Sequence, residues 1–108
     1  MAQDYIVLET ENELGRVQLN KTVFSSIAQN VIEEDENVKI ADSRTFKNGI
    51  VTKIENNSLY LKISIKINHK ANVSDVCAQL QNKIFESISY MTELKPESIE
   101  IEVVGFIF

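Results

Sequence analysis

The strongest constraint on the fold is a strict alternation of apolar and polar side chains over residues 59–67. Every second position is aliphatic, and tyrosine, lysine and serine stand between: Leu59, Leu61, Ile63, Ile65 and Ile67 against Tyr60, Lys62, Ser64 and Lys66. Successive side chains of a β-strand point to opposite faces of the sheet. The segment is therefore predicted to be a strand with one face in the core and the other in water.

The segment before it has the same period. Residues 50–55 also alternate, and Asn56, Asn57 and Ser58 supply the residue types that favour a turn. Two alternating runs joined by such a turn predict a β-hairpin.

Two further segments have the apolar spacing of amphipathic helices. The first follows Asn20 and should end at the acidic run 33–36, because negative charge is unfavourable at a helix C-terminus. Asn20 or Thr22 could cap its start, and Asn37 its end. The second helix begins after Asn72, where a capping box is expected. The positions predicted to face the core are Val23, Phe24, Ile27, Ala28 and Val31 in the first helix, and Val73, Val76, Cys77, Leu80, Ile84, Ile88 and Met91 in the second.

The remaining strands are shorter or lie near the ends. Residues 5–9 and 16–19 are β-type runs, residues 38–48 read as a loop with a short strand, and residues 99–103 alternate after Pro96. The predicted order is β-α-β-β-α-β, with residues 1–14 as an extra strand or a flexible arm. We expect one α+β domain over residues 1–108, a two-layer sandwich with two helices on one face of a mainly antiparallel sheet.

Composition narrows the function classes. The 108 residues carry a net charge of -5, which disfavours binding to a phosphate backbone. The single cysteine excludes an internal disulfide and a multi-cysteine zinc site. The N-terminus lacks a signal-peptide pattern, and the longest charge-free apolar segment, residues 103–108, is too short to span a bilayer. We therefore expect no export by that route and no direct membrane span.

Several short motifs occur in an order that is similar to a known family. They are Gly15-Arg16-Val17, Val23 with Ile27-Ala28, Gly49-Ile50-Val51, the strand 59–67, the stripe Leu80, Ile84 and Ile88, Met91-Thr92, and residues 99–105. Over residues 15–106 the chain resembles the alkaline shock protein family of Gram-positive bacteria. It departs from the family at Asn37 and Glu93, where glycine is usual, and in a shorter segment 40–48, so it looks like a short member.

The resemblance implies a role without catalysis. Such proteins are cytoplasmic, lie at the inner face of the membrane through a membrane-anchored relative, or belong to operons linked to lipid metabolism. For this chain the resemblance thus implies an interaction or scaffold module in envelope stress or lipid metabolism, with a protein partner, homo-oligomers and no cofactor.

The residues themselves offer little chemistry. His69 and Cys77 are the single imidazole and the single thiol, so a Cys/His pair is formally available. Cys77 lies in an apolar helix stripe, where a thiol is usually a small core residue, and His69 reads as a turn residue. We expect no catalytic, cofactor or metal site.

The C-terminal strand offers a candidate partner surface. If Glu100 and Glu102 face water, strand alternation carries Val104, Phe106 and Phe108 to that same face, where apolar groups call for a cover. Tyr60 would lie at the rim. The alternative is that the strand twists or folds back and the phenylalanines join the core.

An outward lysine face is the basis of a second hypothesis. Lys53, Lys62, Lys66 and Lys70 could bind RNA. Cross-strand ion pairs of Lys62 and Lys66 with Glu100 and Glu102 would explain the same charges without a nucleic acid, and no stacking aromatic pair accompanies the lysines. RNA binding is therefore kept as the alternative function.

Overall fold

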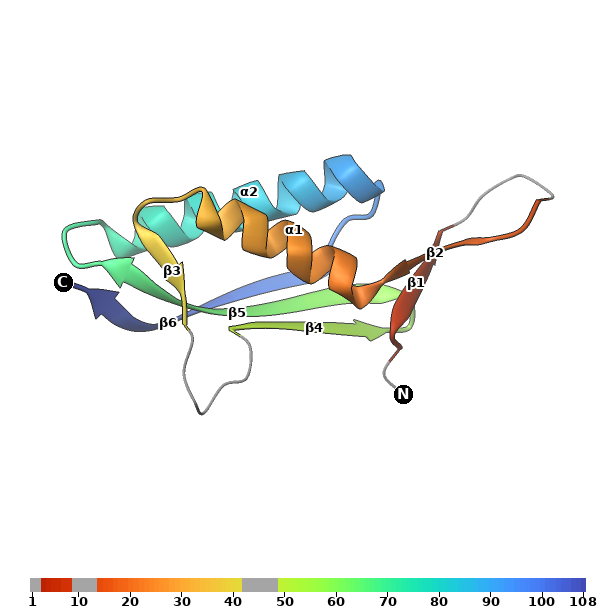
Figure 1. Cartoon of the computed structure of the whole chain (residues 1–108), viewed down its shortest axis with the longest axis horizontal. Coiled ribbons are helices and arrows are strands. Elements are labelled where there is room, and N and C mark those ends of the chain that lie inside the picture. The colour runs from red at the N-terminus through yellow and green to blue at the C-terminus, as the bar shows by residue number, and fades with distance from the viewer. Residues whose placement is uncertain (1–2, 9–13, 42–48) are drawn as a thin grey trace.

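The structure is a computed structural model that describes residues 3–8, 14–41 and 49–108. Its elements are β1 (Tyr5–Leu8), β2 (Val17–Asn20), α1 (Lys21–Glu33), β3 (Val38–Ile40), β4 (Ile50–Glu55), β5 (Ser58–Asn68), α2 (Val73–Thr92) and β6 (Ser98–Ile107). Figure 1 shows both helices above one face of the main sheet. The predicted α+β sandwich is confirmed, and β1 and β3 are added to the predicted order. The short strand predicted within residues 38–48 is β3, and residues 42–48 of that segment, like residues 9–13 of the N-terminal segment, lie outside the described residues.

The main sheet is organised around β5. Strands β3 and β4 both pair antiparallel with it, β3 with residues 65–67 and β4 with residues 58–63. Strand β6 pairs with residues 60–68 of β5 and runs parallel to it. Because β6 occupies one edge of β5, β3 and β4 lie end to end along the other. The sheet is thus mainly antiparallel, as predicted, with α2 forming the crossover that a parallel neighbour requires.

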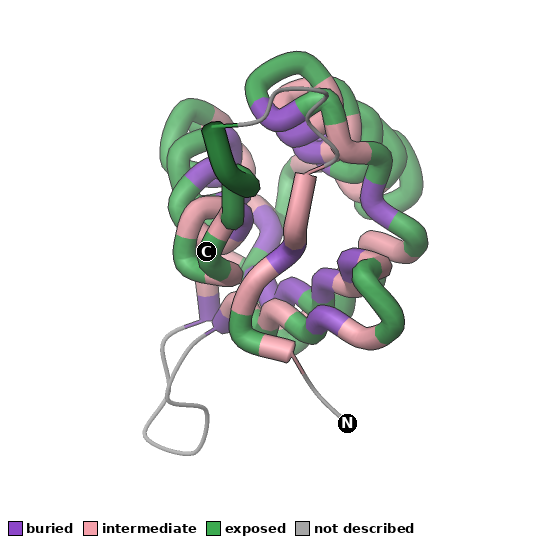
Figure 2. Tube along the Cα trace, turned by 90° about the vertical axis from the view of Figure 1, so that its right-hand side faces the viewer, coloured by how far each residue is buried: buried purple, intermediate pink, exposed green. Residues whose placement is uncertain are grey.

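The core lies between the helices and the sheet. The five alternating aliphatic residues of β5 are all at most 2% exposed, and they pack with Phe24 and Ala28 of α1 and with Leu80, Ile84 and Ile88 of α2. In Figure 2 the buried segments, in purple, recur along the traces of both the helices and the strands. Both predicted helix stripes are confirmed except at the two ends of α2. Val73 is 36% and Met91 66% exposed, because each lies in a terminal turn that no further helical turn covers.

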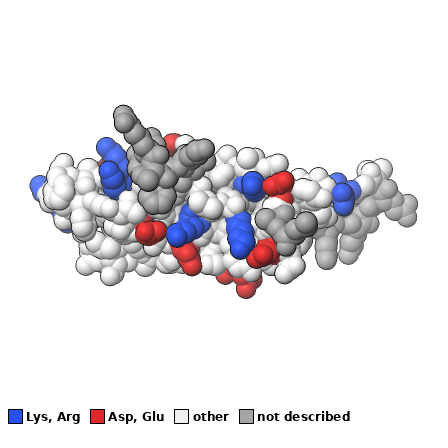
Figure 3. All heavy atoms as spheres, turned by 90° about the horizontal axis from the view of Figure 1, so that it is seen from below, with Lys and Arg blue, Asp and Glu red and all other residues white. Residues whose placement is uncertain are grey.

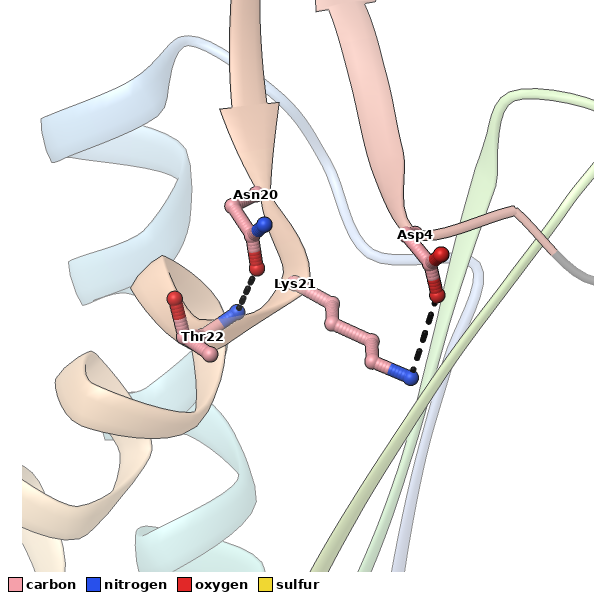
Figure 4. A network of polar contacts seen from close by, with 4 residues as sticks. All are labelled: Asp4, Asn20, Lys21 and Thr22. Atoms are coloured by element: carbon pink, nitrogen blue, oxygen red, sulfur yellow. Dashed lines mark hydrogen bonds and ion pairs between the residues drawn. The ribbon is translucent and has the colours of Figure 1, made fainter.

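Side chains cap both helices at their starts. Asn20 Oδ1 accepts a hydrogen bond from Thr22 N at 3.0 Å, so Asn20 is the cap of α1 (Figure 4). The same view shows Lys21 Nζ 3.4 Å from Asp4 Oδ1, which ties the start of α1 to β1. Asn72 Oδ1 accepts from Asp75 N at 3.1 Å and caps α2 as predicted.

The helix ends differ in part from expectation. Helix α1 stops at the acidic run, but its C-cap is Glu34, and the assignment of Asn37 is wrong. Asn37 N instead donates to Asp35 Oδ1 at 2.9 Å, so a side-chain turn separates the helix from β3. Helix α2 ends at Glu93, which adopts a left-handed conformation with φ 61° and donates its N–H to Ser89 O at 2.9 Å.

Strands β1 and β2 form a separate antiparallel pair at one end of the molecule (Figure 1). Ile6 of β1 is fully buried in the common core, and Gln3 N donates to Ile54 O of β4 at 2.8 Å. The pair is therefore part of the packed domain. This agrees with the strand interpretation of the N-terminal residues over the part that the structure describes.

Candidate interaction surface

The face of the sheet opposite the helices carries most of the predicted functional residues. Lys53 of β4, Tyr60 and Lys62 of β5, and Glu100 and Glu102 of β6 lie on this outer face, since their strand neighbours Ile54, Leu61 and Ile101 turn toward the helices. Figure 3 shows lysines and acidic side chains interleaved across the face. The outer face is therefore mixed in charge.

Ion pairs account for two of the four lysines. Lys62 Nζ lies 3.7 Å from Glu102 Oε2 across the β5/β6 ladder, as predicted from the neighbouring strands. Lys53 Nζ lies 3.4 Å from Glu55 Oε2 on its own strand. Both pairs are about half exposed, so water and salt screen them and their contribution to stability is small.

The other two lysines are placed differently. Lys66 lies directly opposite Lys39 of β3, and its side chain crosses Gly105 instead of reaching a glutamate. Lys70 is beyond the end of β5, in the turn before α2, where its N–H bonds Asn68 Oδ1 at 3.0 Å. Three of the lysines therefore share the outer face, and Lys70 does not belong to the same row.

An open hollow of about 440 Å³ lies on the outer face, over β4 and the first residues of β5 and β6. Tyr60 and Lys62 of β5 line it, together with Lys53 of β4 and Glu100 of β6. Because two lysines and two glutamates, Glu55 and Glu100, line it together, the hollow has no single charge preference.

A β-bulge changes the geometry of the C-terminal strand. Ile65 pairs with Val103 but Lys66 pairs with Gly105, so Val104 has no partner on β5. A Cβ built on Gly105 would lie 3.7 Å from Lys66 Cγ, which places Gly105 on the outer face. Phe106 is then level with Ile67, whose side chain is buried under the helices. The prediction that Phe106 shares the face of Glu100 and Glu102 is wrong, because one inserted residue reverses the alternation.

The three C-terminal apolar residues are nevertheless exposed. Val104 is 40%, Phe106 47% and Phe108 94% accessible, so the alternative in which the phenylalanines join the core is wrong as well. The ring of Phe108 stacks on His69, with centroids 5.1 Å apart. His69 Nδ1 lies 2.8 Å from Ile107 O, so the imidazole holds the end of β6 against the turn before α2. A partner surface at this end remains a prediction.

Cys77 has the environment of a packing residue. It is partly buried in α2 against the core, and burial raises the pKa of its thiol above the ordinary value. A raised pKa lowers the thiolate fraction and hence the nucleophilicity at neutral pH. Among the residues that the structure describes, no three His, Cys, Asp or Glu side chains are grouped to hold a metal ion.

Comparison with protein families assigns the chain. The model of the alkaline shock protein 23 family, described by its cell envelope-related function, matches residues 9–108. The chain belongs to this family. This match confirms the resemblance seen in the sequence. The family description supports an envelope-related role for this alkaline shock protein family member. No curated protein matches the chain significantly. In the part of the chain that the structure describes, no helix is long and apolar enough to cross a membrane.

Proposed function

We propose that this alkaline shock protein family member is a non-catalytic protein-interaction module that acts as a scaffold component in the cell envelope. The observation that carries the proposal is the apolar end of β6. Val104 and Phe106 of β6 and Phe108 directly after it are exposed, and His69 contacts the end of the strand through Ile107 O and the Phe108 ring. Aromatic side chains, phenylalanine included, are enriched in protein interfaces relative to the rest of the surface.

The absence of catalysis is part of the proposal. The imidazole of His69 is engaged by Phe108 on its ring face and by Ile107 O at Nδ1. Cys77 has a raised pKa and packs against the core. Neither group has the arrangement of an activated nucleophile and its base.

The partner in this proposal is a protein, which we place at the inner face of the membrane. A membrane-anchored relative of the same family would bring the domain to the envelope, and a setting in stress or lipid metabolism follows from the family likeness. Homo-oligomers fit the same surface. The supporting fact is the envelope-related description of the family.

Binding to RNA through Lys53, Lys62, Lys66 and Lys70 is the less favoured alternative function. Glutamates pair with Lys62 and Lys53, and Tyr60 is the single aromatic side chain lining the hollow in which these two lysines lie. Single-strand recognition normally needs stacked aromatics along a positive groove. The mixed charge of the outer face favours a protein partner.

The test is cross-linking in cells followed by capture of the tagged protein, with wild type, Phe106→Asp and Val51→Asp compared. Val51 is 55% exposed on β4 and is the matched control. We expect the specific partners to be lost from Phe106→Asp and retained by Val51→Asp, with all three proteins folded by circular dichroism. Equal recovery with the two variants would contradict the proposed surface.

A further inference from the structure

Strand β6 is the edge of the main sheet. It is ten residues long and pairs with β5 on one side, and no other described strand pairs with its second side. Free edges of this length pair readily with other strands, and proteins block them with lysine and other charges, with proline or with bulges. Between Ser98 and Ile107 there is no lysine or proline, and both charged residues, Glu100 and Glu102, precede the bulge at Val104. The part of β6 after the bulge therefore has no charge or proline that would block strand addition.

We propose that β6 pairs antiparallel with β6 of a second copy of this chain, about a two-fold axis at the bulge, so that two sheets become one. The inference rests on the proposed function and names one partner of that surface. Its basis is that, in this arrangement, opposed residues of the two β6 strands lie on the same face of the sheet and the glutamates of the two copies stay apart.

The bulge makes the faces match. On the N-terminal side of it Val103 faces the helices and Glu102 faces outward; on the C-terminal side Phe106 is level with buried Ile67 and Ile107 with Asn68. Opposed residues in an antiparallel pair share a face. An axis between Val104 and Gly105 sets Val103 opposite Phe106 of the second copy and Glu102 opposite its Ile107. Inner side chains thus meet inner ones, and outer side chains meet outer ones.

The same axis separates the acidic residues. Glu100 and Glu102 occupy the N-terminal half of β6, and the half after the bulge is uncharged. With this axis Glu102 lies opposite the uncharged Ile107 of the second copy and Glu100 lies past the end of its β6, whereas parallel pairing would bring the glutamates side by side. Like charges directly opposite one another destabilise a sheet. The antiparallel arrangement also covers Val104 and Phe106, which are 40% and 47% exposed.

Proline at position 104 tests the strand pairing. Val104 has no register partner on β5, and proline is tolerated at bulges, so Val104→Pro should leave the domain folded while interrupting the outer edge. Sedimentation velocity should give the mass of two chains for wild type and of one chain for Val104→Pro. The dissociation constant of the dimer should rise at least about tenfold.

A cysteine placed at the axis tests the same contact without proline. In a Cys77→Ser background, Val104→Cys should form an intermolecular disulfide under mild oxidation, because residues beside a two-fold axis bring their Cα atoms within bonding range. Val51→Cys in the same background is the control, exposed on β4 along the other edge of β5.

The outcomes separate this inference from the proposed function. A dimer that is lost with Val104→Pro and cross-links at position 104 supports it. A wild-type monomer, or a dimer that cross-links at position 51 instead, overturns it. If the protein is monomeric and Phe106→Asp still loses a captured envelope protein, the inference fails and the proposed function stands. If the β6 dimer forms while capture is the same for Phe106→Asp and Val51→Asp, the inference stands and the proposed function fails.

Discussion

The side-chain amide of Asn57 bonds the backbone of Val7 twice. Its Oδ1 accepts a hydrogen bond from Val7 N at 3.0 Å and its Nδ2 donates one to Val7 O at 3.1 Å. The side chain of this turn residue thus satisfies the backbone N–H and C=O of Val7 in β1, as a neighbouring strand would. Asn57 N also donates to Gln3 Oε1 at 2.6 Å. The β4/β5 turn thereby holds the N-terminal strand pair on the domain, fifty positions away in sequence.

Removing this side chain should loosen β1. Asn57→Gly keeps the positive φ of 59° accessible and deletes both amide bonds. We expect a loss of about 1–2 kcal/mol in the free energy of unfolding by urea, together with faster hydrogen exchange at Val7 N–H. Asn56→Gly is the control, because Asn56 has φ 51° in the same turn and makes no such side-chain bond. Equal effects of the two substitutions would show that the amide bonds contribute nothing.

Gly49 is required at a close approach of three strands. A Cβ there would lie 2.8 Å from Ala41 O and 3.0 Å from Ser64 O, both backbone atoms that cannot turn away. Gly49→Ala should therefore cost about 1–3 kcal/mol in thermal or urea unfolding. At Gly105 the nearest atom would be Lys66 Cγ at 3.7 Å, so Gly105→Ala should change stability by less than about 0.5 kcal/mol. Similar losses at both sites would refute the steric explanation.

Glu93 occupies a position that suits glycine. Its φ of 61° at the C-cap of α2 is a conformation that side chains with a Cβ adopt at a cost. Glu93→Gly should stabilise the domain by about 0.5–1 kcal/mol in urea unfolding. Glu93→Ala retains the Cβ and should give no such gain. A stabilisation by alanine equal to that by glycine would point to the lost charge instead of the backbone.

Cys77 should titrate later in the folded protein than in the unfolded chain, because burial raises the pKa of its thiol. Below the unfolded pKa the thiol is neutral in both states, and its contribution to stability is fully present. As pH rises above that value the unfolded chain ionises first, so the free energy of unfolding falls until the folded pKa is passed. Urea titrations at several alkaline pH values should show this fall in wild type and less of it in Cys77→Ser.

The same burial predicts slow thiol chemistry. A maleimide reagent should label native Cys77 at neutral pH far more slowly than the urea-unfolded protein. Rapid labelling of the native protein would restore Cys77 as a candidate nucleophile.

RNA binding should be absent at physiological salt. Lys62 and Lys53 are paired with glutamates, and the chain has a net charge of -5. In filter binding with a single-stranded RNA, we expect the protein to retain no RNA on the filter. Genuine binding to the phosphate backbone would give retention that falls steeply with added salt. Retention that is reduced by Lys66→Ala and Lys62→Ala, and not by Lys83→Ala on α2, would favour the alternative function.

The sequence revealed element types wherever a side-chain period was long and regular. The alternation over residues 59–67 identified β5 and all five of its buried positions, and the stripe through Leu80, Ile84 and Ile88 identified α2. It also located the N-cap of α2 at Asn72 and limited that of α1 to Asn20 or Thr22, of which Asn20 is the cap. These features depend on neighbours within a few residues, so a single sequence is sufficient to predict them.

The same local rules failed where a position depended on a partner strand. Strict alternation placed Phe106 with Glu100 and Glu102, but the ladder with β5 admits an extra residue at Val104 and reverses the faces. Gly105 is a sequence signal that is compatible with a bulge, because an isolated glycine inside a strand often marks one, but the extra residue itself is set by the register against β5. In the same way the helical period put Val73 and Met91 in the core, and the terminal turns of α2 left them exposed.

The sequence by itself determined the types of the long regular elements and most of their buried positions, because these follow from short-range periodicity, and the order of its motifs indicated the family. Only the tertiary structure decided that β6 runs parallel to β5 as an edge strand, that Lys66 lies opposite Lys39 instead of beside a glutamate, and that Asn57 holds Val7. Each of these contacts joins segments far apart in the chain. Their geometry is fixed by the packing of strands and helices together, which no local pattern of side chains encodes.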